Sequence, residues 1–178
     1  WRRKLREMGP LRGFARPLWN GETAPDKTLF LFVEQGLGDT LQFIRFAKAA
    51  RARVGRIVVE VQPALKRLLA GVEGVDELLP QGEKIPPFDF YLPLMSLPRV
   101  LGVTVENLQA PPHYLQAEPE KIAEWREKLK PDGRLLIGLN WQGNPKAAVD
   151  KGRSVPLAQL TPLLQQDGVR FICLQKND

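Results

Sequence analysis

Cysteine and histidine each occur only once in the 178 residues, as Cys173 and His113. A single cysteine excludes an intramolecular disulfide framework, and one cysteine with one histidine excludes a zinc site built from these two residue types. No run of about 18 apolar residues occurs, which excludes a membrane-spanning helix. No apolar stretch of signal-peptide length follows the charged N-terminus. We therefore expect a protein of the reducing cytoplasm.

Sequence motifs of several common enzyme classes are also missing. There is no Walker A loop, no G-x-S-x-G nucleophile elbow and no internal repeat with a period of about 20–50 residues. The net charge is +6, from 26 basic and 20 acidic residues, but most of the excess lies in residues 1–16. A nucleic-acid-binding protein usually spreads its basic charge over one face of its fold. We therefore expect no nucleic-acid partner.

Apolar runs rich in β-branched and aromatic residues alternate along the chain with segments of helical periodicity. Strands are predicted over 28–33, 56–61, 75–79, 88–92, 134–140 and 169–174, and helices over 40–53, 63–69, 96–102, 118–130 and 156–166. This alternation is typical of α/β proteins with a parallel sheet and right-handed crossovers. It occurs in two blocks, each of which begins with a strand, a loop and a helix.

The two blocks lead to a division of the chain into three parts. Residues 1–27 are expected to hold the end of a helix and a connector rich in proline and glycine. Residues 28–130 are predicted to form a Rossmann-like domain, and residues 131–178 the first βαβ unit of a second Rossmann-like domain that is cut short. Because the chain does not begin with Met and ends directly after an apolar run, we expect it to be an excerpt of a longer protein.

A glycine-rich loop joins the first predicted strand to the first helix. Gly36 and Gly38 would let the backbone turn sharply and bring N–H groups close to a ligand. Leu41 replaces the third glycine of the dinucleotide fingerprint, although Glu60 stands near the spacing of its ribose-binding acid. Asp39 would compete with a pyrophosphate for the helix N-terminus. It is either a helix cap or a general base that faces a cleft.

The second strand-to-helix loop, residues 140–154, carries Lys146, Lys151 and Arg153 among glycine, asparagine and serine. Backbone N–H groups and basic side chains ahead of a helix can cradle a phosphate. Ser154 stands where the N-cap of the following helix is expected. An ordinary basic surface loop is the alternative interpretation.

Five short segments occur in order along the chain: Glu34–Phe43, Pro86–Asp89, Leu94–Pro98, Ile137–Pro145 and Arg153–Ser154. Together they resemble the C-terminal glycosyltransferase region of bacterial tetratricopeptide-repeat proteins. That region is similar to the ADP-heptose:lipopolysaccharide heptosyltransferases and, more distantly, to O-linked N-acetylglucosamine transferases. The resemblance covers about residues 15–178, and the combination of segments is specific although each one alone is not.

The resemblance implies a glycosyltransferase of the GT-B type, in which two Rossmann-like domains face each other across a cleft. The N-terminal domain would hold the acceptor and the C-terminal domain the nucleotide-sugar. An inverting transfer to a hydroxyl group of a glycan or a protein is implied, without a metal ion and without a cofactor other than the nucleotide-sugar co-substrate. Protein partners would bind through a repeat region upstream, of which residues 1–9 would be the end.

Individual site residues follow from the same resemblance. Asp39 matches the position of the proposed catalytic carboxylate of the heptosyltransferases, and Arg153 matches a phosphate-contacting basic residue. The neighbours of Asp39 that would contact the acceptor are Gln35, Gly36, Gly38 and Thr40. The residues that would contact the donor phosphates are Asn140, Gly143, Asn144, Lys151, Arg153 and Ser154.

Two departures from the family pattern stand out. Relatives often carry a histidine in the loop after Gly-Asn-Pro, where residues 146–149 have none, and an aliphatic residue where His113 stands. Because most of the donor domain is missing, we expect the fragment to be inactive alone.

Two alternative functions stay open: a non-catalytic interaction scaffold, and an NAD(P)-dependent oxidoreductase suggested by Gly36, Gly38 and Glu60.

Overall fold

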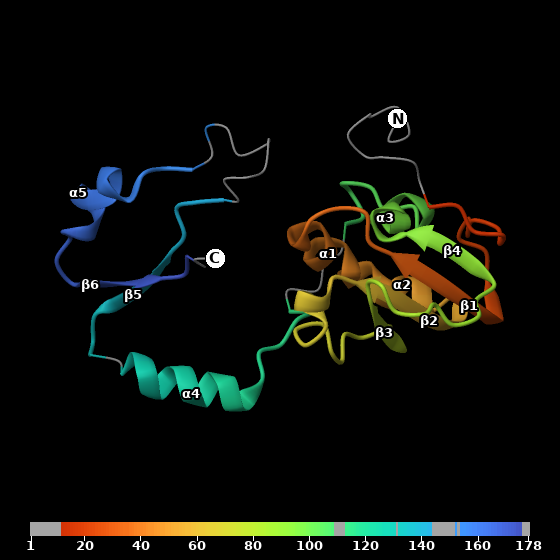
Figure 1. Ribbon diagram of the computed structural model, residues 1–178, viewed down its shortest axis with the longest axis horizontal. Helices are drawn as coiled ribbons and strands as arrows, with labels where there is room; N and C mark the ends of the chain where they lie inside the picture. Colours follow the sequence, from red (N-terminus) through yellow and green to blue (C-terminus); the bar gives the residue numbers. More distant parts are fainter. Residues whose placement is uncertain (1–11, 109–112, 131, 144–151, 153, 176–178) are drawn as a thin grey trace. The chain divides into compact units, whose positions relative to one another are not determined.

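The computed structural model describes residues 12–108, 113–130, 132–143, 152 and 154–175 (Figure 1). The chain forms two compact units that divide between Ala117 and Glu118. The helix predicted over 118–130 therefore belongs to the second unit and not, as expected from the sequence, to the first domain. The helix end predicted over residues 2–8 lies outside the described residues. None of the helices in the described part of the chain has the length and apolar content needed to cross a bilayer.

A parallel sheet of four strands forms the centre of the first unit. The strands are β1 (Ala24–Phe32), β2 (Val54–Val61), β3 (Glu77–Pro80) and β4 (Phe90–Pro93), in the spatial order β3-β2-β1-β4. Every neighbouring pair is parallel, so the carboxyl ends of all four strands lie at one edge. The predicted α/β class with a Rossmann-like parallel sheet is confirmed.

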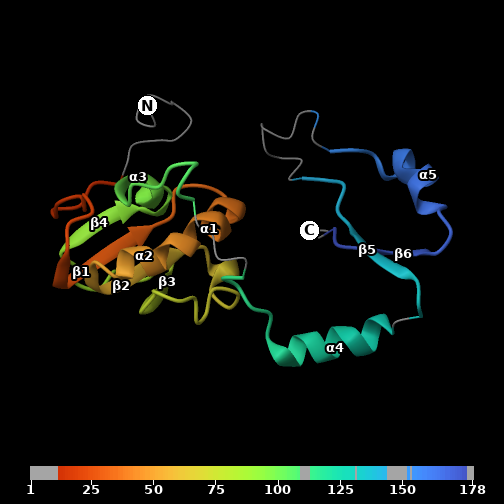
Figure 2. The ribbon, with the colours of Figure 1, turned by 180° about the vertical axis from the view of Figure 1, so that it is seen from behind.

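One face of this sheet is covered by a helical segment that follows β1. It consists of α1 (Leu37–Phe43), the 3-10 helix η3 (Ile44–Phe46) and α2 (Ala47–Arg51), in place of the single helix predicted over 40–53 (Figure 2). Ile44, Ala47 and Ala50 recur at helical spacing and are all fully buried against the sheet. The segment begins at the carboxyl edge of β1, so its N-terminal loop lies where ligands bind in parallel α/β sheets.

The helix predicted over residues 63–69 is wrong. Only the 3-10 helix η4 (Pro63–Leu65) forms, and turns follow it. At Gly74 the chain passes so close to α2 that a Cβ atom on this residue would lie 2.5 Å from the Cα atom of Lys48. Gly71 and Gly74 adopt φ values of 81° and 87°, which favour glycine. Farther on, η5 (Leu94–Ser96) and α3 (Leu97–Val100) stand in place of the helix predicted over 96–102.

The described part of the N-terminal connector packs into the first unit. Trp19 is fully buried, and its backbone N–H donates to the carbonyl of Tyr91 at 3.1 Å. On the other face of the sheet, the ring of Phe14 contacts Phe30 and Phe88 edge-on. In the described part of the first unit, the side chains packed on this face come from strands and loops, and Phe14 of the connector is one of the aromatic groups that shield it from water. The sequence indicated an irregular segment here but not its part in the core.

The second unit contains α4 (Pro119–Leu129), β5 (Leu135–Leu139), η7 (Leu157–Leu160), α5 (Thr161–Leu164) and β6 (Val169–Cys173). β5 and β6 pair in parallel over their whole length. The helix predicted over 156–166 is thus a short 3-10 helix followed by a single α-helical turn. Among the described residues of this unit, no side chain on either strand is fully buried.

Candidate functional site

The loop between β1 and α1 lies at the carboxyl edge of the sheet and contains the predicted acid. Asp39 stands in the first turn of α1, and its Oδ2 atom accepts the N–H of Gly36 at 3.1 Å. The other carboxylate oxygen, Oδ1, has no hydrogen bond within the described part of the chain, and Asp39 is partly exposed. One oxygen of Asp39 thus caps the helix while the other can meet a ligand.

The two glycines of this loop are not required by the backbone conformation. Gly36 has a φ of −68°, and neither Gly36 nor Gly38 has a positive φ. The prediction that these glycines are needed for a sharp backbone turn therefore does not explain why they occur here. A Cβ atom on Gly38 would meet nothing within 4 Å, and one on Gly36 would lie 3.7 Å from Oδ2 of Asp39. Their missing side chains leave open space next to Asp39, through which a ligand can approach the backbone.

A glutamine that is not among the predicted site residues holds this loop in place. Gln62 directly follows β2, and its Oε1 atom accepts the hydroxyl hydrogen of Thr40 at 2.9 Å. Its Nε2 atom donates to the carbonyl of Gln35 at 2.9 Å. Thr40 is 2% exposed and its hydroxyl is paired, so it positions the loop instead of presenting itself to an acceptor. The position of Gln62 after the neighbouring strand was the signal that could have found it.

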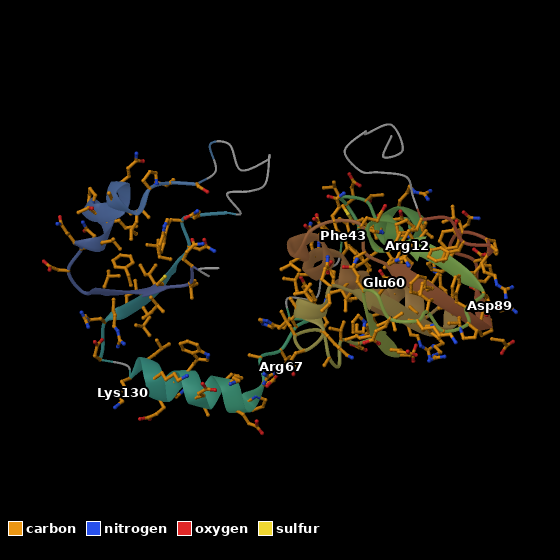
Figure 3. All side chains as sticks on the ribbon, in the orientation of Figure 1. Arg12, Phe43, Glu60, Arg67, Asp89 and Lys130 are labelled. Carbon is orange, nitrogen blue, oxygen red and sulfur yellow. The ribbon has the colours of Figure 1, made fainter. Side chains whose placement is uncertain are left out.

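The carboxylate suggested as a ribose-binding acid is already paired. Glu60 is 3% exposed, and its two carboxylate oxygens lie 2.7 and 2.5 Å from Nη1 of Arg12 (Figure 3). The Arg12 guanidinium also lies 5.2 Å from the ring centroid of Phe14. Because both oxygens are held by Arg12, Glu60 does not offer an acceptor to a ribose hydroxyl. The oxidoreductase alternative therefore has no free acid at the position on which it depended.

Asp89, the last residue of the Pro86–Asp89 segment, has a structural role. Its carboxylate accepts the N–H of Thr28 at 2.9 Å and the ammonium of Lys27 at 3.1 Å (Figure 3). The hydrogen bond from Thr28 and then that from Lys27 hold the pKa of Asp89 below its usual value. These contacts tie the start of β4 to β1, whereas Asp39 follows the carboxyl end of β1.

In the second unit, the loop after β5 carries part of the predicted phosphate cradle. The N–H of Gln142 donates to Oε1 of Gln175 at 3.0 Å and also lies 3.3 Å from Oδ1 of Asn140. The N–H of Gly143 donates to Oγ of Ser154 at 3.0 Å. These two backbone amides are thus satisfied within the protein, and a phosphate could use them only by displacing side chains.

Ser154 does not cap the helix that follows it. The first turn begins at Leu157, after Pro156 as N-cap, while the Ser154 hydroxyl accepts the N–H of Gly143. The proline at 156 separates Ser154 from the helix, so the predicted N-cap is wrong. The remaining residues proposed to contact the donor, Asn144, Lys151 and Arg153, lie outside the described residues.

A cavity of about 440 Å³ opens beside this loop. Asn140, Trp141 and Gly143 line it from the carboxyl end of β5, and Val155 and Leu160 line it from the following segment. Cavities of this size hold small molecules, and ligands of parallel α/β sheets bind at the carboxyl ends of the strands. Within the described ranges, no group of three or more His, Cys, Asp or Glu side chains is arranged to hold a metal ion.

Comparison with known proteins supports the fold. No model of a known protein family matches the chain. Protein FlbA of Caulobacter vibrioides is 26% identical to it over an alignment of 181 positions, which covers 90% of this chain and 30% of FlbA. The crystal structure of the glycosyl transferase family 9 protein from Veillonella parvula matches with a TM-score of 0.57 and 14% identity. That match covers 85% of this chain and 64% of the transferase chain.

These likenesses define the class of fold. The chain has a Rossmann-like α/β fold similar to that of a glycosyl transferase of family 9. It spans less than a third of the length of FlbA and less than two thirds of the length of the transferase chain.

Proposed function

We propose that this chain is part of a glycosyltransferase that moves a sugar from a nucleotide-sugar to a hydroxyl acceptor. The observation that carries the proposal is the unpaired Oδ1 atom of Asp39, at the carboxyl edge of a parallel sheet and beside the open positions of Gly36 and Gly38. The fold similarity to a family 9 glycosyl transferase supports the same class of reaction.

In the proposed mechanism, Asp39 acts as the general base. Its Oδ1 atom takes the proton of the acceptor hydroxyl while the hydroxyl oxygen attacks the anomeric carbon of the donor. The bond from that carbon to the diphosphate oxygen breaks, and the nucleoside diphosphate leaves with the bonding electrons, which inverts the anomeric centre. The Gly36 N–H, which donates to Oδ2, keeps the carboxylate oriented during this step.

The donor is proposed to bind at the second unit, in the cavity beside Asn140, Trp141 and Gly143. The Gln142 and Gly143 amides are paired, so the charge of the leaving diphosphate is assigned to the side chains of Lys151 and Arg153. The mechanism needs no metal ion. We further propose a cytoplasmic protein in which a tetratricopeptide-repeat region upstream binds protein partners.

The test compares Asp39→Asn with the wild type in the full-length protein. An asparagine oxygen can still accept the Gly36 N–H, so the loop is expected to keep its shape while the base is lost. Transfer from a panel of nucleotide-sugars should fall by about 10²–10⁴-fold, with donor affinity almost unchanged. Asp89→Asn is the matched control, because its carboxylate ties β4 to β1 and its loss should lower stability but not turnover.

Three outcomes would contradict the proposal. Unchanged turnover in Asp39→Asn would remove Asp39 from the mechanism. The absence of both binding and transfer with every nucleotide-sugar in the panel would favour the interaction scaffold. Tighter binding of NAD(H) than of nucleoside diphosphates would favour the oxidoreductase.

A further inference from the structure

A second cavity, of about 340 Å³, lies in the first unit. It is bounded by the η3–α2 part of the helical segment, by the turns at residues 68–73 and by residues 113–116. None of the loop residues from Gln35 to Thr40 lines it, so it is separate from the candidate catalytic loop. Its volume is at the lower end of the range of small-molecule sites, which is about 300–1,000 Å³.

Three basic side chains, Arg45, Lys48 and His113, line this cavity. Lys48 forms an ion pair of 2.8 Å with Glu73, and both side chains of this pair are largely exposed. Because Glu73 neutralises the charge of Lys48, the charge of the cavity suits one anionic group and not a polyanion. The remaining permanent charge belongs to Arg45.

Arg45 has an unsatisfied hydrogen-bond donor. Its Nε atom is buried and has no hydrogen-bond partner among the residues that the structure describes. Its guanidinium lies 5.1 Å from the ring centroid of Phe46, a contact that does not use the N–H groups in the guanidinium plane. A buried N–H group without an acceptor is uncommon in folded proteins, because the lost hydration is not replaced. Because no described residue accepts from this donor, turning it toward a ligand in the cavity would break no hydrogen bond with that part of the chain.

The wall formed by residues 113–116 is held in a defined position. The hydroxyl of Tyr114 donates to the carbonyl of Leu41 at 3.0 Å, which fixes residues 113–116 against the helical segment. Leu68 and Leu115 add apolar surface to the lining. The lining therefore combines the Arg45 guanidinium and the Lys48–Glu73 ion pair with apolar side chains, which suits a small molecule that carries one phosphate group.

We propose that this cavity binds a small phosphomonoester, such as a sugar phosphate. The Nε–H and one Nη–H group of an arginine form a fork that matches two oxygens of a phosphate. In the proposed complex, the Arg45 side chain turns so that this fork faces the phosphate, while Lys48 and His113 lie beside it in the cavity lining. The proposal does not depend on glycosyl transfer or on Asp39, so either can fail without the other.

The first experiment is a nitrogen-15 NMR titration of the 178-residue chain with inorganic phosphate and with glucose 6-phosphate. The Nε–H resonance of Arg45 should shift in a saturable way, with a dissociation constant for phosphate on the order of 1–10 mM. Glucose 6-phosphate should bind several-fold more tightly, because its sugar contacts Leu68 and Leu115. The absence of a saturable shift at Arg45, or equal affinity for the two probes, would overturn the proposal.

Matched variants complete the test. Arg45→Gln should weaken the binding of glucose 6-phosphate by about tenfold or more, and Arg45→Lys should weaken it by about fivefold because the charge stays but the fork is lost. Arg99→Gln removes the same charge from α3, outside the cavity lining, and should change the affinity by less than about twofold. Melting temperatures would show that each variant is folded. Equal affinity in Arg45→Gln and the wild type would refute the assigned role of Arg45.

Discussion

The ion pair between Arg12 and Glu60 provides a direct test of how the first unit is held together. Glu60 on β2 is almost completely buried, and Arg12, from the segment before β1, holds both of its carboxylate oxygens. We predict that Arg12→Ala destabilises the first unit, because it leaves a buried carboxylate without a countercharge. The same result would show that Glu60 is structural and unavailable to a ribose.

The magnitude follows from the burial of the two partners. Removing one partner of a fully buried ion pair costs about 3–5 kcal/mol. The side chain of Arg12 is 45% exposed, so water already weakens this pair, and we expect Arg12→Ala to lower the free energy of unfolding by about 2 kcal/mol. The lost contact with the Phe14 ring accounts for about 0.5 kcal/mol of that value.

A double-mutant cycle measures the coupling. Glu60→Leu puts an apolar side chain beside Phe32 and Val58, so its free energy of unfolding should stay within about 1 kcal/mol of wild type. Once Glu60 is leucine, Arg12→Ala should cost only its ring contact, which gives a coupling energy of about 1.5 kcal/mol. Urea unfolding, followed by circular dichroism and by the emission of the buried Trp19, supplies the four values.

The control for this cycle is Arg56→Ala, also on β2. The ion pair of Arg56 with Glu77 is half-exposed on both sides, so its loss should cost less than about 1 kcal/mol. A cost below about 0.5 kcal/mol for Arg12→Ala, or additive effects in the double variant, would refute the reasoning.

Three further predictions concern single positions. Asp89→Asn should lower the free energy of unfolding by about 1 kcal/mol at pH 7, through its weaker hydrogen bond with the Thr28 N–H. Because the folded pKa of Asp89 lies below 3.8, this contribution is present above pH 3.8 and is lost as the pH falls through the folded pKa. Urea unfolding should therefore show a smaller stability difference between wild type and Asp89→Asn at pH 3 than at pH 7. Gly38→Ala should leave the free energy of unfolding unchanged or raise it by up to about 1 kcal/mol, since the new Cβ atom has free space. The same variant should reduce transfer by the full-length protein, and full activity would contradict the proposed approach of a ligand. Lys130→Gly should stabilise the end of α4 by about 0.5–1 kcal/mol because Lys130 has a φ of 41°, and a lower melting temperature would contradict this expectation.

Several features could be predicted because they depend on neighbours in the sequence. The continuous apolar run over 28–33 predicted β1, since a strand buried on both faces needs apolar side chains at every position. Asp39 was predicted as a possible cap at the helix N-terminus, where a carboxylate is favourable, and its cap contact reaches only three residues back. The parallel α/β class followed from the alternation of such segments.

Other features depend on which strands and loops become neighbours in space. The pairing of Arg12 with Glu60, and that of Gln62 with Thr40, joins residues on different elements. Local pattern also placed Ser154 at a helix N-cap, whereas the fold brings its hydroxyl to the Gly143 amide across the loop. A residue's own neighbours in the chain govern its backbone preference and its tendency to be buried. The partner of a polar group is chosen only when the sheet has assembled, because burial then requires that each donor and acceptor be satisfied by whatever the fold has brought within reach.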